Sequence, residues 1–154
     1  MLHEYELTLI VRADLDDATI EAIVDKTEAV VTDEKGHILI RDDWGKRKLA
    51  YPIQKQLKGH YFLITLLSEA RHIDELERKI RIEDKIVRFL TVRVGDSVDV
   101  ETRLEEALIM RKQLAEQARL RAEADALAEA EAEAARDSGT EFEQAEPRPE
   151  IAAS

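Results

Sequence analysis

One short segment of the chain, residues 44–61, gathers the side chains best suited to binding a polyanion. It holds five cations and no acidic residue, although the whole chain of 154 residues carries a formal net charge of −11. Ammonium and guanidinium groups clustered in this way bind phosphate oxygens, so the segment predicts a surface for a negatively charged partner such as a nucleic acid. The cations of this basic segment are Lys46, Arg47, Lys48, Lys55 and Lys58.

A second group of cations lies between residues 78 and 93, diluted only by Glu83 and Asp84. Cations near the end of a helix complement its dipole by about 0.3–1 kcal/mol each, which would explain those at residues 78–81. The dipole does not explain Arg88 and Arg93, which follow in an expected strand. Two basic groups on one small domain therefore favour polyanion binding. The members are Arg78, Lys79, Arg81, Lys85, Arg88 and Arg93.

Residues for catalysis or metal binding are not grouped in a recognisable pattern. The absence of cysteine excludes disulfides, thiolate ligands and thiol nucleophiles. The four histidines stand apart, without the spacing of metal ligands. Asp42 and Asp43 form a carboxylate pair, but no nucleophile or glycine-rich phosphate loop accompanies them, and aspartate is a preferred turn residue. We predict no catalytic residue, no metal site and no cofactor.

Hydrophobic periodicity predicts the elements that position these cations. Alternation over residues 5–11 is typical of a half-buried strand. Aspartates within residues 14–17 offer N-cap oxygens for a helix whose apolar stripe runs over residues 20–31, with Gly36 as its C-terminal cap.

The strand pattern resumes at residues 37–41 and continues, past a turn or bulge at residues 42–45, into the basic segment. Pro52 donates no ladder hydrogen bond, so this strand belongs at the edge of a sheet or carries a bulge. A break is expected at Lys58–Gly59. Residues 61–67 are apolar on both faces, which predicts a central strand.

Two further elements complete the domain. Helical spacing over residues 73–81 predicts an amphipathic helix. Residues 86–94 predict a strand with Leu90, Val92 and Val94 on one side and Arg88 on the other. The order β-α-β-β-α-β predicts an α+β fold of the ferredoxin-like, split β-α-β kind, with both helices on one face of a four-stranded antiparallel sheet. The other face would be open.

The open face predicts a protein partner. Whichever alternating set of residues 61–67 lies there is too apolar for permanent exposure. We therefore expect a partner protein to contact the third strand at Tyr61, Phe62 and Ile64.

Composition changes after the predicted domain, residues 1–95. Residues 96–137 are rich in Ala, Glu and Arg and predict a helical extension, and residues 138–154 predict a disordered acidic tail. The N-terminus is acidic where a signal peptide is basic, and no apolar run approaches the ~20 residues of a membrane span. We expect a soluble cytoplasmic protein without membrane association.

Residues 58–63 are similar to the third-strand signature of an RNA recognition motif. Lys58, Gly59 and Phe62 fit that signature, whereas His60 and Tyr61 depart from it. A free-standing RNA recognition module that stacks bases on these rings is therefore an alternative, although burial of the rings is the simpler interpretation.

The sequence resembles the sixth protein of the bacterial small ribosomal subunit over residues 1–94. The most specific match is Leu49-Ala50-Tyr51-Pro52-Ile53 after Gly45 and Arg47. The other matching residues are Tyr5-Glu6, Trp44, Gly59, Tyr61, Arg81-Ile82 and Val87-Arg88.

The resemblance implies a non-catalytic structural constituent of the small subunit, with the ferredoxin-like fold and no small-molecule substrate. It implies two partners, which are the central domain of small-subunit ribosomal RNA at the platform and the eighteenth protein of the same subunit. An acyl-phosphate hydrolase on this fold is a less favoured alternative, because residues 12–16 lack the glycine of a phosphate loop and are rich in acid. The family's basic positions correspond to Arg47, Lys48, Arg81 and Arg88, to which we add Lys46, Lys55, Lys58 and Lys85.

Overall fold

The computed structural model describes residues 1–96 and 98–139, and the chain divides into two compact units, Met1–Arg111 and Lys112–Ser154, each considered by itself. Of the acidic tail predicted at residues 138–154, residues 140–154 lie outside the described residues. The strands are β1 (His3–Arg12), β2 (His37–Ile53), β3 (Gln56–Ser68) and β4 (Ile86–Gly95), and the helices are α1 (Asp17–Asp33), α2 (Ala70–Ile82) and α3 (Val100–Gly139).

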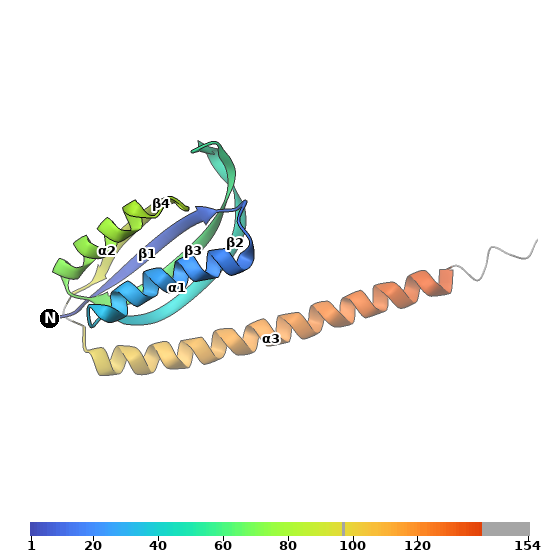
Figure 1. The fold of residues 1–154 in the computed structure, drawn as a ribbon. Coiled ribbons are helices and arrows are strands. Elements are labelled where there is room, and N and C mark those ends of the chain that lie inside the picture. Colours follow the sequence, from blue (N-terminus) through green and yellow to red (C-terminus); the bar gives the residue numbers. More distant parts are fainter. Residues whose placement is uncertain (97, 140–154) are drawn as a thin grey trace, which may run out of the picture. The chain divides into compact units, whose positions relative to one another are not determined.

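The four strands form one sheet in the order β2-β3-β1-β4, and every neighbouring pair is antiparallel. Helices α1 and α2 pack on the same face of this sheet (Figure 1). The predicted ferredoxin-like fold class is confirmed. Pro52 lies in β2, which is an edge strand. Its missing N–H therefore does not interrupt the hydrogen bonds between central strands.

The main core lies between the sheet and these two helices. Alternate residues of β1 point into it, and Leu7, Leu9 and Val11 are fully buried. Burial of a side chain of this size contributes about 1.5–3 kcal/mol. The stripe of α1 meets them with Ile20 and Val24, so the periods of 2 and 3.6 residues in the sequence produce this layer directly.

Helix α1 begins as predicted and ends differently. The Asp16 carboxylate accepts a hydrogen bond from the Thr19 backbone N–H at 3.0 Å, which caps the first turn. The C-cap is Glu34, and Lys35, not Gly36, adopts the left-handed conformation at φ 59°. Gly36 is required for a different reason: a Cβ there would lie 2.8 Å from the carbonyl oxygen of Leu67.

The break predicted at Lys58–Gly59 is wrong. Strand β3 runs through both residues, and the hairpin turns at Gln54 and Lys55, with φ values of 49° and 63°. Two successive positive φ values are typical of a type I′ hairpin turn, which usually selects Asn or Gly. Gly59 instead permits close packing, because a Cβ there would lie 2.4 Å from Cγ2 of Ile10.

The irregularity predicted at residues 42–45 is a bulge in β2. The β2–β3 register shifts between Asp43 and Gly45, and Gly45 has φ +75°. Asp43 accepts a hydrogen bond from the Gly45 N–H at 2.7 Å, and Asp42 accepts one from the Trp44 indole at 2.8 Å. The two carboxylates hold the bulge, in agreement with their interpretation as turn residues.

The sheet face opposite α1 and α2 is not wholly open. A second apolar cluster joins Leu39 and Leu67 to Ala107, in the first turns of α3. Arg103 of α3 donates to both carboxylate oxygens of Glu4 in β1, and Arg111 donates to the backbone oxygens of Ile38 and Leu39. The compact unit therefore continues to Arg111, past the domain boundary predicted at residue 95.

Among the described residues, no helix combines the length and the apolar character needed to cross a membrane.

Candidate nucleic-acid interface

The basic segment forms the projecting end of the β2–β3 hairpin. Strand β1 stops at Arg12, which pairs with Gly59, so the rungs from Lys48↔Lys58 to Ile53↔Gln56 extend beyond it. Figure 1 shows this hairpin tip leaving the rest of the sheet. Because paired residues lie side by side, the register brings Lys48 and Lys58 together although the chain separates them.

One arginine from the second basic group joins this hairpin. Arg88 of β4 donates a hydrogen bond to the Tyr51 hydroxyl at 2.6 Å, and its guanidinium lies 5.7 Å from the centre of the Tyr51 ring. Arg47 packs in the same way on Trp44, at 5.4 Å. An arginine stacked on a ring keeps the N–H groups at its edge for phosphate oxygens. The two basic groups thus meet at one end of the sheet.

Two more predicted cations lie near this end. Val11 pairs with Ile86 where β1 ends and β4 begins, which places Lys85 beside the root of the hairpin. The guanidinium of Arg81, in the last turn of α2, lies 5.5 Å from the centre of the Phe89 ring. Both side chains are exposed.

The predicted cations differ in whether a carboxylate of the same chain lies nearby, although ion pairs as exposed as these are weak. Lys46 lies 3.6 Å from Asp17 and Arg81 lies 3.1 Å from Glu77. In the part of the chain that the structure describes, the other six predicted cations form no ion pair with a carboxylate: Arg47, Lys48, Lys55, Lys58, Lys85 and Arg88. No neighbouring carboxylate of the described chain offsets the positive charge of these six side chains, so they can pair with an external anion.

The other cations of the second group have internal partners. Arg78 donates two hydrogen bonds of 2.8 Å to Glu75, and these bonds lower the pKa of that carboxyl below its usual value. Arg93 pairs with Asp96. The partners of Arg78, Lys79 and Arg93 lie only three or four positions along the chain, so the local spacing of charges already indicates these pairs.

The loop after β1 lacks the arrangement of a phosphate-binding site. Arg12 donates to Asp14 at 2.6 and 3.1 Å, which lowers the pKa of Asp14. The Thr19 hydroxyl donates a hydrogen bond to the Asp16 carboxylate, and this bond is the main cause of the lowered pKa of Asp16. Two ionised carboxylates repel a phosphate, so the loop disfavours the acyl-phosphate hydrolase.

The predicted protein-contact residues lie on different faces. Phe62 and Ile64 are buried in the main core beneath the helices and offer no surface to a partner in this fold. Tyr61 pairs with Ile10 on the opposite face, where it is half-buried. His60 stacks on Phe62 with ring centres 4.6 Å apart, inside the structure. This burial also disfavours a base-stacking platform of the RNA recognition motif type.

The apolar side of β4, which the sequence showed, lies on the exposed face of the sheet, although the sequence analysis did not assign it to a partner. Leu90 pairs with Thr8 and Val92 with Glu6, and these two apolar side chains are 61% and 43% exposed. Arg88 pairs with Ile10 and so shares the face of Leu90 and Val92, which corrects the prediction that it points the other way. The alternation was visible in the sequence, since residues 88, 90 and 92 are two apart.

The fold and the site define a class of protein: a small ferredoxin-like domain with a group of exposed cations at one end of its sheet. Residues 4–93 match the family model described as "Ribosomal protein S6". The chain belongs to the ribosomal protein S6 family, and the family expected from the sequence is confirmed.

Named relatives agree with this assignment. The small ribosomal subunit protein bS6 of Desulfitobacterium hafniense is 44% identical over 92 residues, covering 60% of this chain and 97% of the relative. The protein of the same name from Trichlorobacter lovleyi is 35% identical over 122 residues, covering 79% of this chain and all of the relative.

A solved structure supports the fold. The crystal structure of 30S ribosomal protein S6 from Thermotoga maritima matches with a TM-score of 0.59 at 27% identity, covering 70% of this chain and 99% of that one. The relatives and this solved structure are all named as ribosomal proteins of the small subunit.

Proposed function

We propose that the chain is a structural protein of the small ribosomal subunit that binds ribosomal RNA through the hairpin end of its sheet. The observation that carries this proposal is the group of cations that have no carboxylate partner among the described residues, joined across the sheet by Arg88 and Tyr51. Phosphate contacts dominate the affinity of proteins for nucleic acids, and unpaired exposed cations supply such contacts. The role requires no catalytic step, no cofactor and no small-molecule substrate.

A quadruple variant tests the RNA site: Arg47→Ala, Lys48→Ala, Arg81→Ala and Arg88→Ala. Its binding to a central-domain fragment of small-subunit RNA is measured by filter binding from 50 to 300 mM salt. Each lost phosphate contact should lower the slope of log K against log salt by about 0.7–0.9. Thermal unfolding should remain cooperative, because all four side chains are exposed.

A matched control removes the same charge elsewhere: Lys112→Ala, Arg119→Ala, Arg121→Ala and Arg136→Ala, all in α3. The control should bind with a nearly unchanged slope, because its cations make no phosphate contact. Equal affinity and equal slope for parent, quadruple variant and control would show that the hairpin is not the RNA site.

We further propose that the uncovered part of the sheet face binds the eighteenth protein of the same subunit, the partner implied by the family resemblance. Exposed Leu90 and Val92 on β4, with half-buried Tyr61 on the same face across β1, supply an apolar surface bordered by Arg88. Apolar residues at the centre of an interface with charge at its rim are typical of protein partners.

Hydrogen exchange with and without this partner tests the contact. Added protection is expected in β4 and in the part of β3 around Tyr61, whereas the end covered by α3 should change little. The variant Val92→Glu should weaken binding, while Leu108→Glu, at an exposed residue of α3, serves as the control. Protection confined to α1 and α2 would contradict the proposed face.

A further inference from the structure

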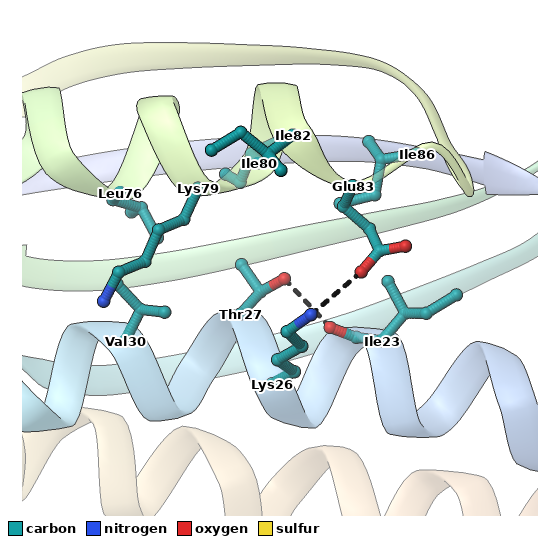
Figure 2. Close-up of a pocket in the computed structure, with 10 residues that line it drawn as sticks. All are labelled: Ile23, Lys26, Thr27, Val30, Leu76, Lys79, Ile80, Ile82, Glu83 and Ile86. Atoms are coloured by element: carbon teal, nitrogen blue, oxygen red, sulfur yellow. Dashed lines mark hydrogen bonds and ion pairs between the residues drawn. The ribbon is translucent and has the colours of Figure 1, made fainter.

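A small apolar cavity opens between α1 and α2, on the layer of helices and not on the sheet face proposed for the ribosomal partners. Figure 2 shows side chains of both helices converging around it. Its volume is about 150 Å³. Aliphatic side chains from α1, α2 and the start of β4 form most of its wall: Ile23, Val30, Leu76, Ile80, Ile82 and Ile86.

The size of the cavity limits what can enter it. An apolar cavity of about 150 Å³ accommodates a group the size of benzene. One leucine or phenylalanine side chain therefore fits, whereas a whole acyl chain or a nucleotide does not. Ile82, at the rim, is 64% exposed, so apolar surface continues outside the cavity.

The rim carries two lysines that the proposed RNA site does not use. Lys26 lies 3.1 Å from Glu83 and is itself 74% exposed, and Figure 2 shows this pair beside the cavity. Lys79 lies 3.8 Å from Glu75. Ion pairs this exposed hold their partners weakly. Each ammonium group has three N–H donors, so both lysines can donate hydrogen bonds to an incoming carboxylate as well.

We propose that the groove between α1 and α2 binds an acidic segment of another protein, which inserts one leucine- or phenylalanine-sized side chain while its flanking carboxylates pair with Lys26 and Lys79. The charged residues that line the cavity are two lysines and Glu83, with Glu75 beside Lys79 outside the lining, in a chain whose net charge is −11. An apolar anchor with complementary rim charges is a common mode of peptide recognition.

A titration of the full chain, followed by amide NMR shifts, tests the proposal with a blocked peptide of sequence Asp-Glu-Phe-Glu-Asp. Saturable shifts are expected in residues 23–30 and 76–86, with a dissociation constant on the order of 0.1–1 mM for a single anchor. The same peptide with alanine in place of phenylalanine should bind about tenfold more weakly, because the cavity stays empty.

Variants separate the cavity from general electrostatic attraction. Lys26→Glu with Lys79→Glu should weaken binding about tenfold or more. The matched pair Lys35→Glu with Lys112→Glu makes the same charge change outside the groove and should change binding less than about twofold. Thr27→Leu fills the cavity from its wall and should abolish the preference for phenylalanine over alanine, with the thermal midpoint confirming that the variant is folded.

Three results would overturn the proposal. The first is equal affinity for the phenylalanine and alanine peptides, and the second is the lack of saturable shifts at several millimolar peptide. The third is a set of shifts around Arg47 and Lys48 in place of the groove, which would show attraction to the hairpin cations. None of these results bears on the RNA site, whose test uses other residues.

Discussion

The two ends of the sheet differ in whether their arginines are paired with carboxylates of the same chain. At the end covered by the start of α3, Arg103 is paired with Glu4 and Glu106, and Leu67 is fully buried. At the hairpin end, Arg47 and Arg88 pack on aromatic rings and lack carboxylate partners in the described chain, while Leu90 is 61% exposed. Side chains at the first end stabilise the fold, and those at the second remain available to a ligand.

The largest expected effect comes from truncating one leucine at each end. Leu67→Ala should lower the free energy of unfolding by about 2–5 kcal/mol, because it leaves a cavity beneath Ala107. Leu90→Ala should change it by no more than about 0.5 kcal/mol, because the side chain is already in water. Urea unfolding of both variants measures the difference. Similar losses for the two would mean that the ends are packed alike.

Truncating one arginine at each end should have smaller effects on the free energy of unfolding. The variant that loses less stability should lose more RNA affinity. Arg103→Ala leaves Glu4, whose side chain is 13% exposed, without its partner, so a loss of about 1–2 kcal/mol in unfolding free energy is expected. Arg88→Ala removes an exposed stacking contact worth about 0.5–1 kcal/mol. RNA affinity should fall for Arg88→Ala and stay near the parent value for Arg103→Ala. Filter binding measures RNA affinity and urea unfolding measures stability. An arginine whose removal lowered both equally would contradict the division between the two ends.

The smallest effect concerns the hairpin turn. Gln54→Gly should raise the free energy of unfolding by about 0.5–1 kcal/mol, because glycine adopts a φ of 49° without strain. It leaves the charge of the hairpin unchanged, so RNA binding should be retained. Lys55→Gly relieves a similar strain and also removes one cation, so it should weaken RNA binding slightly. If both variants lost RNA affinity equally, hairpin conformation rather than charge would control binding.

Several features of the fold could be predicted because they depend on neighbours along the chain. The alternation of β1, the stripe of α1 and the Asp16 cap are local patterns, and each agrees with the structure. Pro52 correctly placed β2 at an edge, since a missing N–H excludes a central strand wherever the chain goes. Together with the basic segment and the family resemblance, these patterns were enough for the fold class and for the expectation of a polyanion.

The chain alone could not reveal contacts between distant residues. Glycine is a common turn residue, so Gly59 was assigned to a break, whereas its role is to let Ile10 and Leu49 approach from other strands. Phe62 and Ile64 were proposed for a partner because an alternating strand does not show which of its faces the helices cover.

What the sequence by itself determined is therefore the kind of each element and the position of the cations along the chain. Only the tertiary structure decided which cations remain unpaired and which part of the sheet face is covered. The pair Arg103 and Glu4 is separated by 99 positions, and Arg88 and Tyr51 by 37. Local spacing predicts pairs three or four residues apart, such as Arg78 and Glu75, but these long-range neighbours are brought together only by the packing of strands and helices.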